Sequence, residues 1–189
     1  VWEEEDHGDG HHHDHGDYDA HIWLSNKNVI KMTKFLIREL SKINPDKKNI
    51  YKANAKVFIN KVKANAAKIR KDLDSVKDKP YIVFHDAYQY FETENSLSSV
   101  GSIALNPEIS PTPNRIKEIK AKIEKDNVVC LFREPQFPSR VVQTVIQETN
   151  AKEGELDPLG FDLKPGKNLY FELVTNLSKN LRECLSNGS

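Results

Sequence analysis

The residues best suited to chemistry in this chain are concentrated at its start. Residues 1–19 contain eight carboxylates, no Lys or Arg, and five imidazoles. With so few apolar side chains the tract cannot bury a core, and we expect it to be a mobile loop. Neutral imidazole is a good donor for zinc, copper and nickel, so the tract is predicted to hold divalent metal at low-affinity accessory positions. Its histidines are His7, His11, His12, His13 and His15.

Three further candidate metal ligands lie outside this tract. His21 precedes an apolar run, His85 ends another, and Asp157 stands in an Asp-Pro dipeptide. Each also has a plain structural interpretation: a histidine at the start of a helix, a satisfied half-buried histidine, and a turn. Together they would give zinc two nitrogen donors and one oxygen donor, with room for one more ligand.

The elements that must position these residues are predicted from periodicity. Helical spacing covers 28–43 and then 50–76, where about 30 residues without Gly or Pro would form a rod of about 45 Å. Beyond Pro80, short apolar strands alternate with helices, which predicts an α/β fold with a parallel sheet. The strands are expected at 81–84, 100–105 and 128–132, with a short strand or loop at 151–156, and the helices at 86–94, 113–123, 138–149 and 167–185.

The ends of these strands are where a ligand is expected. In parallel sheets, ligands bind outside the carboxyl ends of the strands. His85 follows the first strand, Glu134 the third and Asp157 the fourth. The site would therefore be assembled by the fold from distant segments.

Composition limits the alternatives. The 189 residues carry no net formal charge, and no run approaches the roughly 18 apolar residues of a membrane span. The basic residues are scattered without interleaved aromatics, so we expect no nucleic-acid partner. We also expect a monomer. Since the chain begins at Val1 without a leader, we expect a mature protein or a piece of one.

Enzymatic signals are weak, and we expect that the protein is not an enzyme. The chain lacks H-E-x-x-H, G-x-S-x-G and P-loop sequences. A zinc hydrolase would need a general base beside an open coordination position, for which Glu134 or Glu92 could be proposed. An artificial histidine tag is disfavoured because Asp and Gly interrupt the histidines.

Two cysteines remain. Cys130 lies in a predicted buried strand and Cys184 in the last turns of a predicted helix. A disulfide between them and a pair of buried free thiols are both consistent with these positions.

Four segments in order resemble a known family: DAHIWLS at 19–25, FHDAYQYFE at 84–92, REPQF at 133–137 and LDPLG at 156–160. They are similar to the periplasmic zinc-binding (ZnuA-like) proteins of bacterial high-affinity zinc ABC transporters, in the cluster A-I/9 group of metal-binding solute-binding proteins. The resemblance covers nearly the whole chain, and the four motifs together are highly specific.

The resemblance implies two α/β lobes, joined by one long rigid helix, with the metal in the cleft between them. By position, 1–19 is the family's His-rich loop, 20–43 is a remnant of the first lobe, 44–78 is the linking helix and 79–189 is the second lobe. Most of the first lobe would then be absent from this chain.

The resemblance also implies a function. Such a protein captures Zn²⁺ in the periplasm and delivers it to an inner-membrane ABC permease. His21 and His85 correspond to metal ligands, and Asp157 to an acidic position near the metal. A manganese or other divalent-metal protein of the same family is the alternative, although His rather than Glu at position 85 favours zinc. Cys130 and Cys184 correspond to a disulfide, which fits an oxidising compartment.

Two departures from the family pattern bear on this expectation. The family's first metal histidine, upstream of the His-rich loop, has no counterpart here, which implies weaker zinc binding than in full-length members. Asn26 stands where a proline is usual, and we expect that change to be harmless.

The His-rich tract gives the first testable prediction. Deleting residues 3–17 should lower the number of zinc ions bound per chain and leave the highest-affinity site intact, because the tract supplies only accessory donors. Equilibrium dialysis with metal analysis measures both quantities. An unchanged stoichiometry would remove the accessory role of the tract.

Overall fold

The computed structural model describes residues 19–104 and 107–186. The helices are α1 Asn26–Ile43, α2 Lys48–Leu73, α3 Gln89–Asn95, α4 Pro113–Lys125, α5 Arg140–Ile146 and α6 Leu169–Ser186. The strands are β1 Tyr81–Val83, β2 Gly101–Ser102, β3 Cys130–Arg133 and β4 Lys152–Glu155. Three 3-10 turns complete the described chain: η1 Ile22–Leu24, η2 Pro45–Lys47 and η3 Asp74–Val76.

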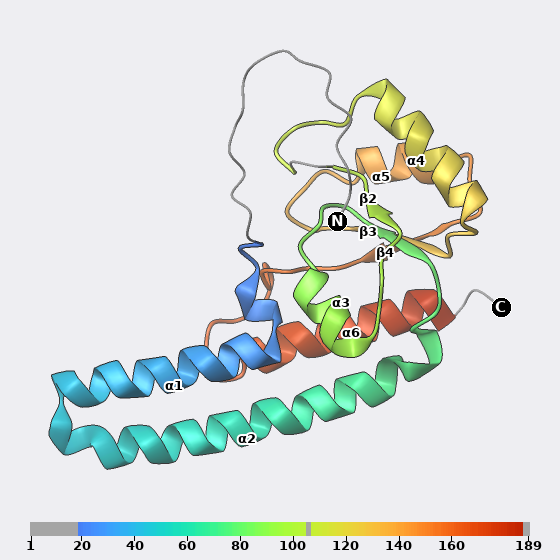
Figure 1. Cartoon of the computed structure of the whole chain (residues 1–189). Coiled ribbons are helices and arrows are strands. Elements are labelled where there is room, and N and C mark those ends of the chain that lie inside the picture. The colour runs from blue at the N-terminus through green and yellow to red at the C-terminus, as the bar shows by residue number, and fades with distance from the viewer. Residues whose placement is uncertain (1–18, 105–106, 187–189) are drawn as a thin grey trace, which may run out of the picture.

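The four strands form one parallel sheet in the order β2-β1-β3-β4, which confirms the predicted α/β fold. Helices α4 and α5 cover one face, and α3, α6 and the end of α2 cover the other (Figure 1). The strands are shorter than predicted. The second extends little beyond Gly101–Ser102, although the amides of Val100 and Ile103 still donate to carbonyls of β1 and so continue the pairing.

Consecutive side chains of β1 enter different cores because side chains alternate across a strand. Tyr81 and Val83 belong to the cluster beneath α6, whereas Ile82 and Phe84 belong to the cluster beneath α4 and α5. A strand buried on both faces reads as a short continuous apolar run, and this run located the strand in the sequence.

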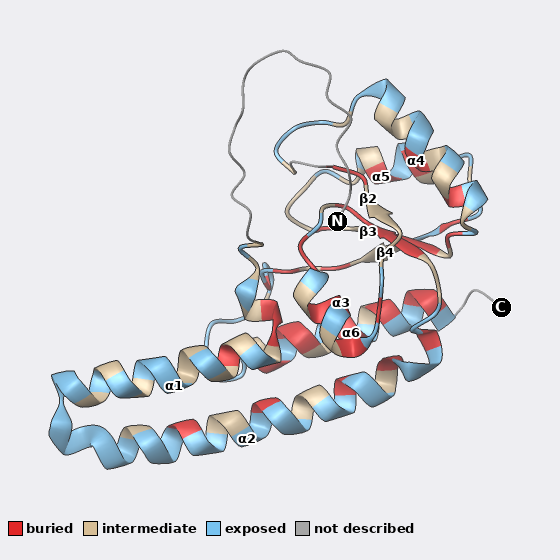
Figure 2. Ribbon diagram, in the orientation of Figure 1, coloured by how far each residue is buried: buried red, intermediate tan, exposed pale blue. Residues whose placement is uncertain are grey.

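Helices α1 and α2 form an antiparallel hairpin that projects from the sheet (Figure 1). The predicted rod is the 26-residue α2, about 39 Å long, with η2 before it and η3 after it. Pro45 begins the 3-10 turn η2 and not the long helix. The far end of the hairpin is largely exposed (Figure 2), and there the apolar side of α1 is uncovered: Leu36 is 55% and Ile43 79% exposed. The first half of α1 is covered, since Val29 packs with Val62 and Phe171.

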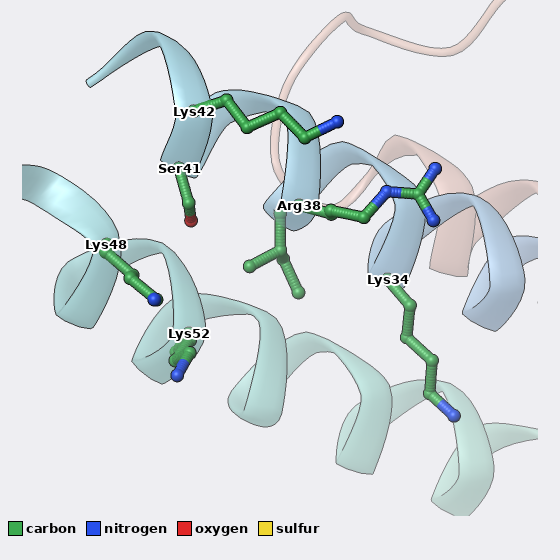
Figure 3. Close-up of a pocket in the computed structure, with 7 residues that line it drawn as sticks. Lys34, Arg38, Ser41, Lys42, Lys48 and Lys52 are labelled. Carbon is green, nitrogen blue, oxygen red and sulfur yellow. The ribbon is translucent and has the colours of Figure 1, made fainter. Parts of the chain in front are cut away.

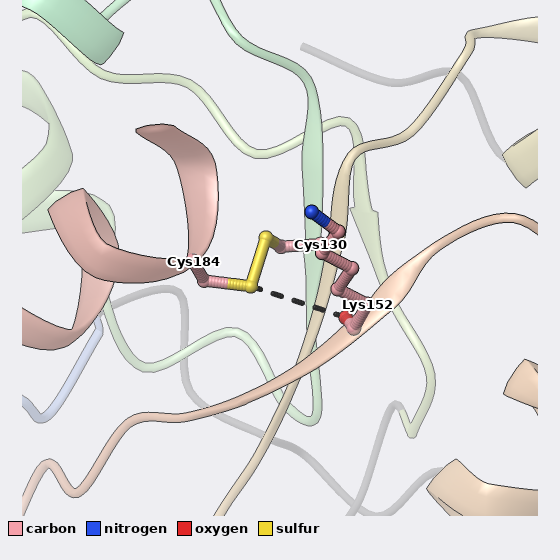
Figure 4. The surroundings of a disulfide bond; sticks show 3 residues. All are labelled: Cys130, Lys152 and Cys184. Carbon is pink, nitrogen blue, oxygen red and sulfur yellow. Dashed lines mark hydrogen bonds between the residues drawn. A yellow bond between two sulfur atoms is a disulfide. The ribbon is translucent and has the colours of Figure 1, made fainter. Parts of the chain in front are cut away.

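A disulfide joins Cys130 of β3 to Cys184 of α6, beside Lys152 of β4 (Figure 4). The Cα atoms are 6.2 Å apart, and the bond closes a loop between residues 54 apart in sequence. The disulfide alternative is therefore confirmed. The disulfide ties α6 to the first residue of the central strand β3, and the candidate site lies at the opposite, carboxyl end of that strand.

Replacing both cysteines by alanine should lower the free energy of unfolding by about 2–4 kcal/mol, because the unfolded chain regains the entropy that the closed loop removed. Denaturant unfolding followed by circular dichroism measures the loss. A reducing agent should destabilise the parent protein but leave the variant unchanged. Equal stability of parent and variant would contradict the expectation.

Candidate metal-binding site

His21 and His85 come from segments 64 residues apart and meet edge to edge. Their Nε2 atoms are 3.4 Å apart and their ring centroids 5.3 Å apart. His21 is the residue immediately before η1, and His85 lies two residues beyond the end of β1. Both rings are partly buried, with 23% and 13% of their side-chain surface exposed.

Each imidazole is held from behind by a carboxylate. Nδ1 of His21 lies 2.6 Å from Oδ1 of Asp19, and Nδ1 of His85 lies 2.6 Å from Oε1 of Glu134. A neutral imidazole that donates its Nδ1–H has its remaining lone pair on Nε2. The pair is therefore presented with both Nε2 atoms toward each other, which is how histidines with carboxylate partners are oriented in metal sites.

Topology explains why Glu134 reaches His85. In the sheet, β2 lies on one side of β1 and β3 on the other, so a topological switch point lies between β1 and β3. Such a point leaves a crevice at the carboxyl ends of the two strands. His85 follows β1 and Glu134 directly follows β3, so both project at this crevice. Glu134 is only 2% exposed, and Phe137 packs against the His85 ring with centroids 6.3 Å apart.

Tyr88 lies behind the site and remains a neutral donor. Its hydroxyl donates to the carbonyl of Leu156 at 3.1 Å. Burial, with the nearby charges of Glu134 and Asp157, raises the pKa of this phenol. Tyr88 thus fixes the end of β4 to the segment that follows His85.

Asp157 is engaged by its own turn. Its Oδ1 accepts from the amides of Leu159 and Gly160 and from Nε2 of Gln136, at 3.0, 2.9 and 2.5 Å. Its Oδ2 accepts from the amide of Phe161 at 2.6 Å. The turn interpretation made from Asp-Pro accounts for the three bonds from backbone amides, and the fourth comes from the side chain of Gln136, 21 residues earlier. The turn also anchors the His21 segment, since Trp23 Nε1 donates to the carbonyl of Pro158 at 2.8 Å.

Neither carboxylate considered as a general base is placed for that task. Glu134 holds His85, and buried Glu92 accepts from the hydroxyl of Tyr81 at 2.7 Å. Burial raises the pKa of Glu92, and the Tyr81 hydrogen bond partly opposes that shift.

Within 19–104 and 107–186, no group of three or more His, Cys, Asp or Glu side chains is arranged so that it could hold a metal ion. The two histidines are thus brought together without a third donor beside them. The accessory residues His7, His11, His12, His13 and His15 lie outside the described part of the chain. Oδ2 of Asp19 is buried and accepts no hydrogen bond from the described residues.

A separate hollow lies between α1 and α2, away from the histidines (Figure 3). It measures about 510 Å³, and five of its lining residues are cationic. A positive lining repels a dication, so this hollow is not a metal site. The five cations are Lys34, Arg38, Lys42, Lys48 and Lys52.

Sequence reasoning missed the role of Asp19, and it considered Glu134 as a strand-end carboxylate and as a possible general base but not as a partner of His85. The spacing Asp19-x-His21 was a usable signal, because Asp19 also caps the backbone amide of His21 at 2.9 Å. Glu134 gave no such local signal, since its partner lies 49 residues away.

The fold is that of metal-binding solute-binding proteins. A crystal structure of ZnuA matches with a TM-score of 0.77 at 23% identity, over 88% of this chain and 60% of that one. The laminin-binding adhesin Lmb of Streptococcus agalactiae also matches with a TM-score of 0.77, at 25% identity over 89% of this chain and 63% of that one.

The sequence model of the ZnuA family, "Zinc-uptake complex component A periplasmic", matches residues 2–184, and the chain belongs to this family. The high-affinity zinc uptake system protein ZnuA of Brucella suis is 42% identical over 171 residues, which are 90% of this chain and 51% of the relative. The corresponding Yersinia pestis protein is 37% identical over 188 residues, 93% of this chain and 59% of the relative. The chain thus spans about half the length of these relatives.

Glu134→Gln should lower Zn²⁺ affinity by about 10- to 100-fold, because the amide polarises and orients the His85 ring less well than the carboxylate. Calorimetric titration against a competing chelator measures the change. Glu148→Gln is the matched control, since Glu148 is an exposed carboxylate that pairs with Lys120. Equal affinity of Glu134→Gln and the control would contradict the role given to Glu134.

Proposed function

We propose that this chain binds Zn²⁺ through Nε2 of His21 and His85, as the metal-capturing part of a solute-binding protein. In this proposal the protein takes zinc in the periplasm, delivers it to an inner-membrane ABC permease and catalyses no reaction. Membership of the ZnuA family supports the proposal. None of the helices in 19–104 and 107–186 has the length and apolar character that crossing a bilayer requires.

One observation carries the proposal: the 3.4 Å between the two Nε2 atoms. Two nitrogens bound at about 2.0–2.1 Å to one tetrahedral zinc lie about 3.3 Å apart. With both Nδ1 atoms turned to carboxylates, two lone pairs face each other across that gap. Their repulsion is relieved by a cation placed between them, and imidazole nitrogen suits Zn²⁺ better than Mn²⁺.

The remaining coordination positions would be filled by water or by Asp157. The Asp157 carboxylate could bind the metal only by exchanging some of its four hydrogen bonds. We therefore propose that the two histidines are the fixed donors. Asp157 would be a further donor whose carboxylate is shared between the metal and the hydrogen bonds that it now accepts.

For the organisation of the chain we propose that 20–43 belongs to a first lobe, 44–78 is the linking helix and 79–189 is the second lobe. The uncovered apolar side of the hairpin supports this division, since Phe35 is 53% and Val57 70% exposed. Leu24 nevertheless lies in the core beneath α6, so the His21 end of this segment is fixed to the second lobe.

The proposal is tested by titrating zinc into the full chain with a chelator that suppresses weak sites. His21→Ala and His85→Ala should each lower the affinity of the strongest site by more than about 100-fold, because a single imidazole holds the ion poorly. His12→Ala is the matched control from the tract and should leave that site unchanged. Mn²⁺ at equal concentration should not displace the zinc.

Asp157→Asn separates the two roles of that carboxylate, because an amide oxygen keeps part of the turn but is a poorer ligand for zinc. Undiminished affinity in both histidine variants would refute the site. Turnover of ester, peptide or phosphate substrates by the zinc-loaded chain would instead favour the hydrolase.

A further inference from the structure

The carboxylate of Glu94 binds the start of the helix that follows His21. Oε1 accepts from Ser25 Oγ at 2.6 Å and from the amide of Lys27 at 3.1 Å. Oε2 accepts from both the amide and the side-chain Nδ2 of Asn26, each at 2.9 Å. One side chain of α3 thus receives four hydrogen bonds from three consecutive residues of the His21 segment.

Helix α1 depends on this carboxylate. The first amides of a helix lack partners within the helix and carry partial positive charge, which an anion stabilises. The first turn of α1 contains no acidic residue of its own. Ser25 is the N-cap and satisfies the amide of Asn28 at 3.0 Å, while Glu94 satisfies those of Asn26 and Lys27.

The same face of α3 makes a second contact with the His21 segment. Tyr90, one helical turn before Glu94, donates its hydroxyl to the carbonyl of Asp19 at 3.2 Å. Asp19 is the residue that holds Nδ1 of His21. Since α3 begins four residues after His85, one short stretch of chain carries His85 and both contacts to the His21 segment.

We propose that Glu94 is a positioning residue that sets the distance of His21 from His85, an inference that rests on the proposed zinc function. Only the single 3-10 turn η1 separates His21 from the residues that Glu94 holds. Backbone bonds close that turn, with Leu24 and Ser25 donating to the carbonyls of His21 and Ile22. A shift of the α1 start is therefore transmitted to the His21 ring.

Asn26 allows a sharp test by exchange of partners. Its Oδ1 accepts from Tyr170 at 3.1 Å, and its Nδ2 donates to Glu94. In Glu94→Gln a side-chain NH₂ group opposes the donors of Asn26. In the double variant Glu94→Gln/Asn26→Asp, the new carboxylate accepts from that NH₂ group and still accepts from Tyr170, so the side-chain link is restored with its polarity reversed. The backbone amide of residue 26 still faces the NH₂ group, so we expect partial recovery.

Zinc titration of the full chain with a competing chelator should show about tenfold weaker binding for Glu94→Gln and partial recovery in the double variant. Co²⁺ visible absorption should report a distorted site in the single variant only. Glu118→Gln, an exposed carboxylate paired with Arg115, is the matched control. Unchanged affinity in Glu94→Gln would overturn the positioning role while the zinc proposal stands.

Amide hydrogen exchange of residues 21–28 in the metal-free protein tests the same role without zinc. Exchange should be faster in Glu94→Gln than in the parent and should slow again in the double variant. Equal exchange in parent and single variant would overturn the positioning role even if the histidines bound no metal. If exchange follows the prediction but His21→Ala leaves zinc binding intact, the proposed function fails and the contact between α3 and α1 stands.

Discussion

The arrangement depends on two hydrogen bonds between imidazole and carboxylate, Asp19 to His21 and Glu134 to His85. Each fixes the ring and directs Nε2 toward the other ring, so that the two nitrogens lie 3.4 Å apart. Without these bonds, the rings would rotate about their side-chain torsions and the separation would be undefined. The proposed zinc site gains from donors that are already oriented, because less conformational entropy is lost on binding.

The sheet and its helices supply the frame for these bonds. The switch point between β1 and β3 brings His85 beside Glu134. The two hydrophobic cores, one on each face of the sheet, restrain the strands that precede these residues. The His21 segment reaches the same place by a different route. Trp23 donates to the carbonyl of Pro158, Leu24 packs in the core beneath α6, and Tyr90 of α3 donates to the carbonyl of Asp19. The segment is therefore fixed to the sheet and its helices rather than to the projecting hairpin.

Much of this was predictable from the sequence, because periodicity locates helices buried on one side and short apolar runs locate strands buried on both faces. The helix over 28–43, the strand at 81–84 and the alternation beyond Pro80 are all present. The exposure of Ile43 and Leu36 was not, since a helical stripe shows which side is apolar but not whether anything covers it. The disulfide was one of two alternatives from the residues alone, and the fold decides it.

The site was only partly predictable. His21 and His85 are marked by apolar neighbours and by strand ends, but Glu94 lies in the last turn of a short helix and has no local signal. Asn26 was expected only to be a harmless departure from the family pattern, and nothing in the sequence indicated that its amide group joins Glu94 to Tyr170. Contacts between residues about 70 to 140 positions apart follow from the tertiary arrangement, which no local pattern encodes.

A crystal structure of the zinc-loaded chain, with the ion located by its anomalous scattering, tests the central claim most directly. The account predicts one zinc bonded to Nε2 of His21 and Nε2 of His85 at about 2.0–2.1 Å, with both Nδ1 atoms still on their carboxylates. A strongly bound zinc elsewhere, with these two nitrogens unligated, would contradict it.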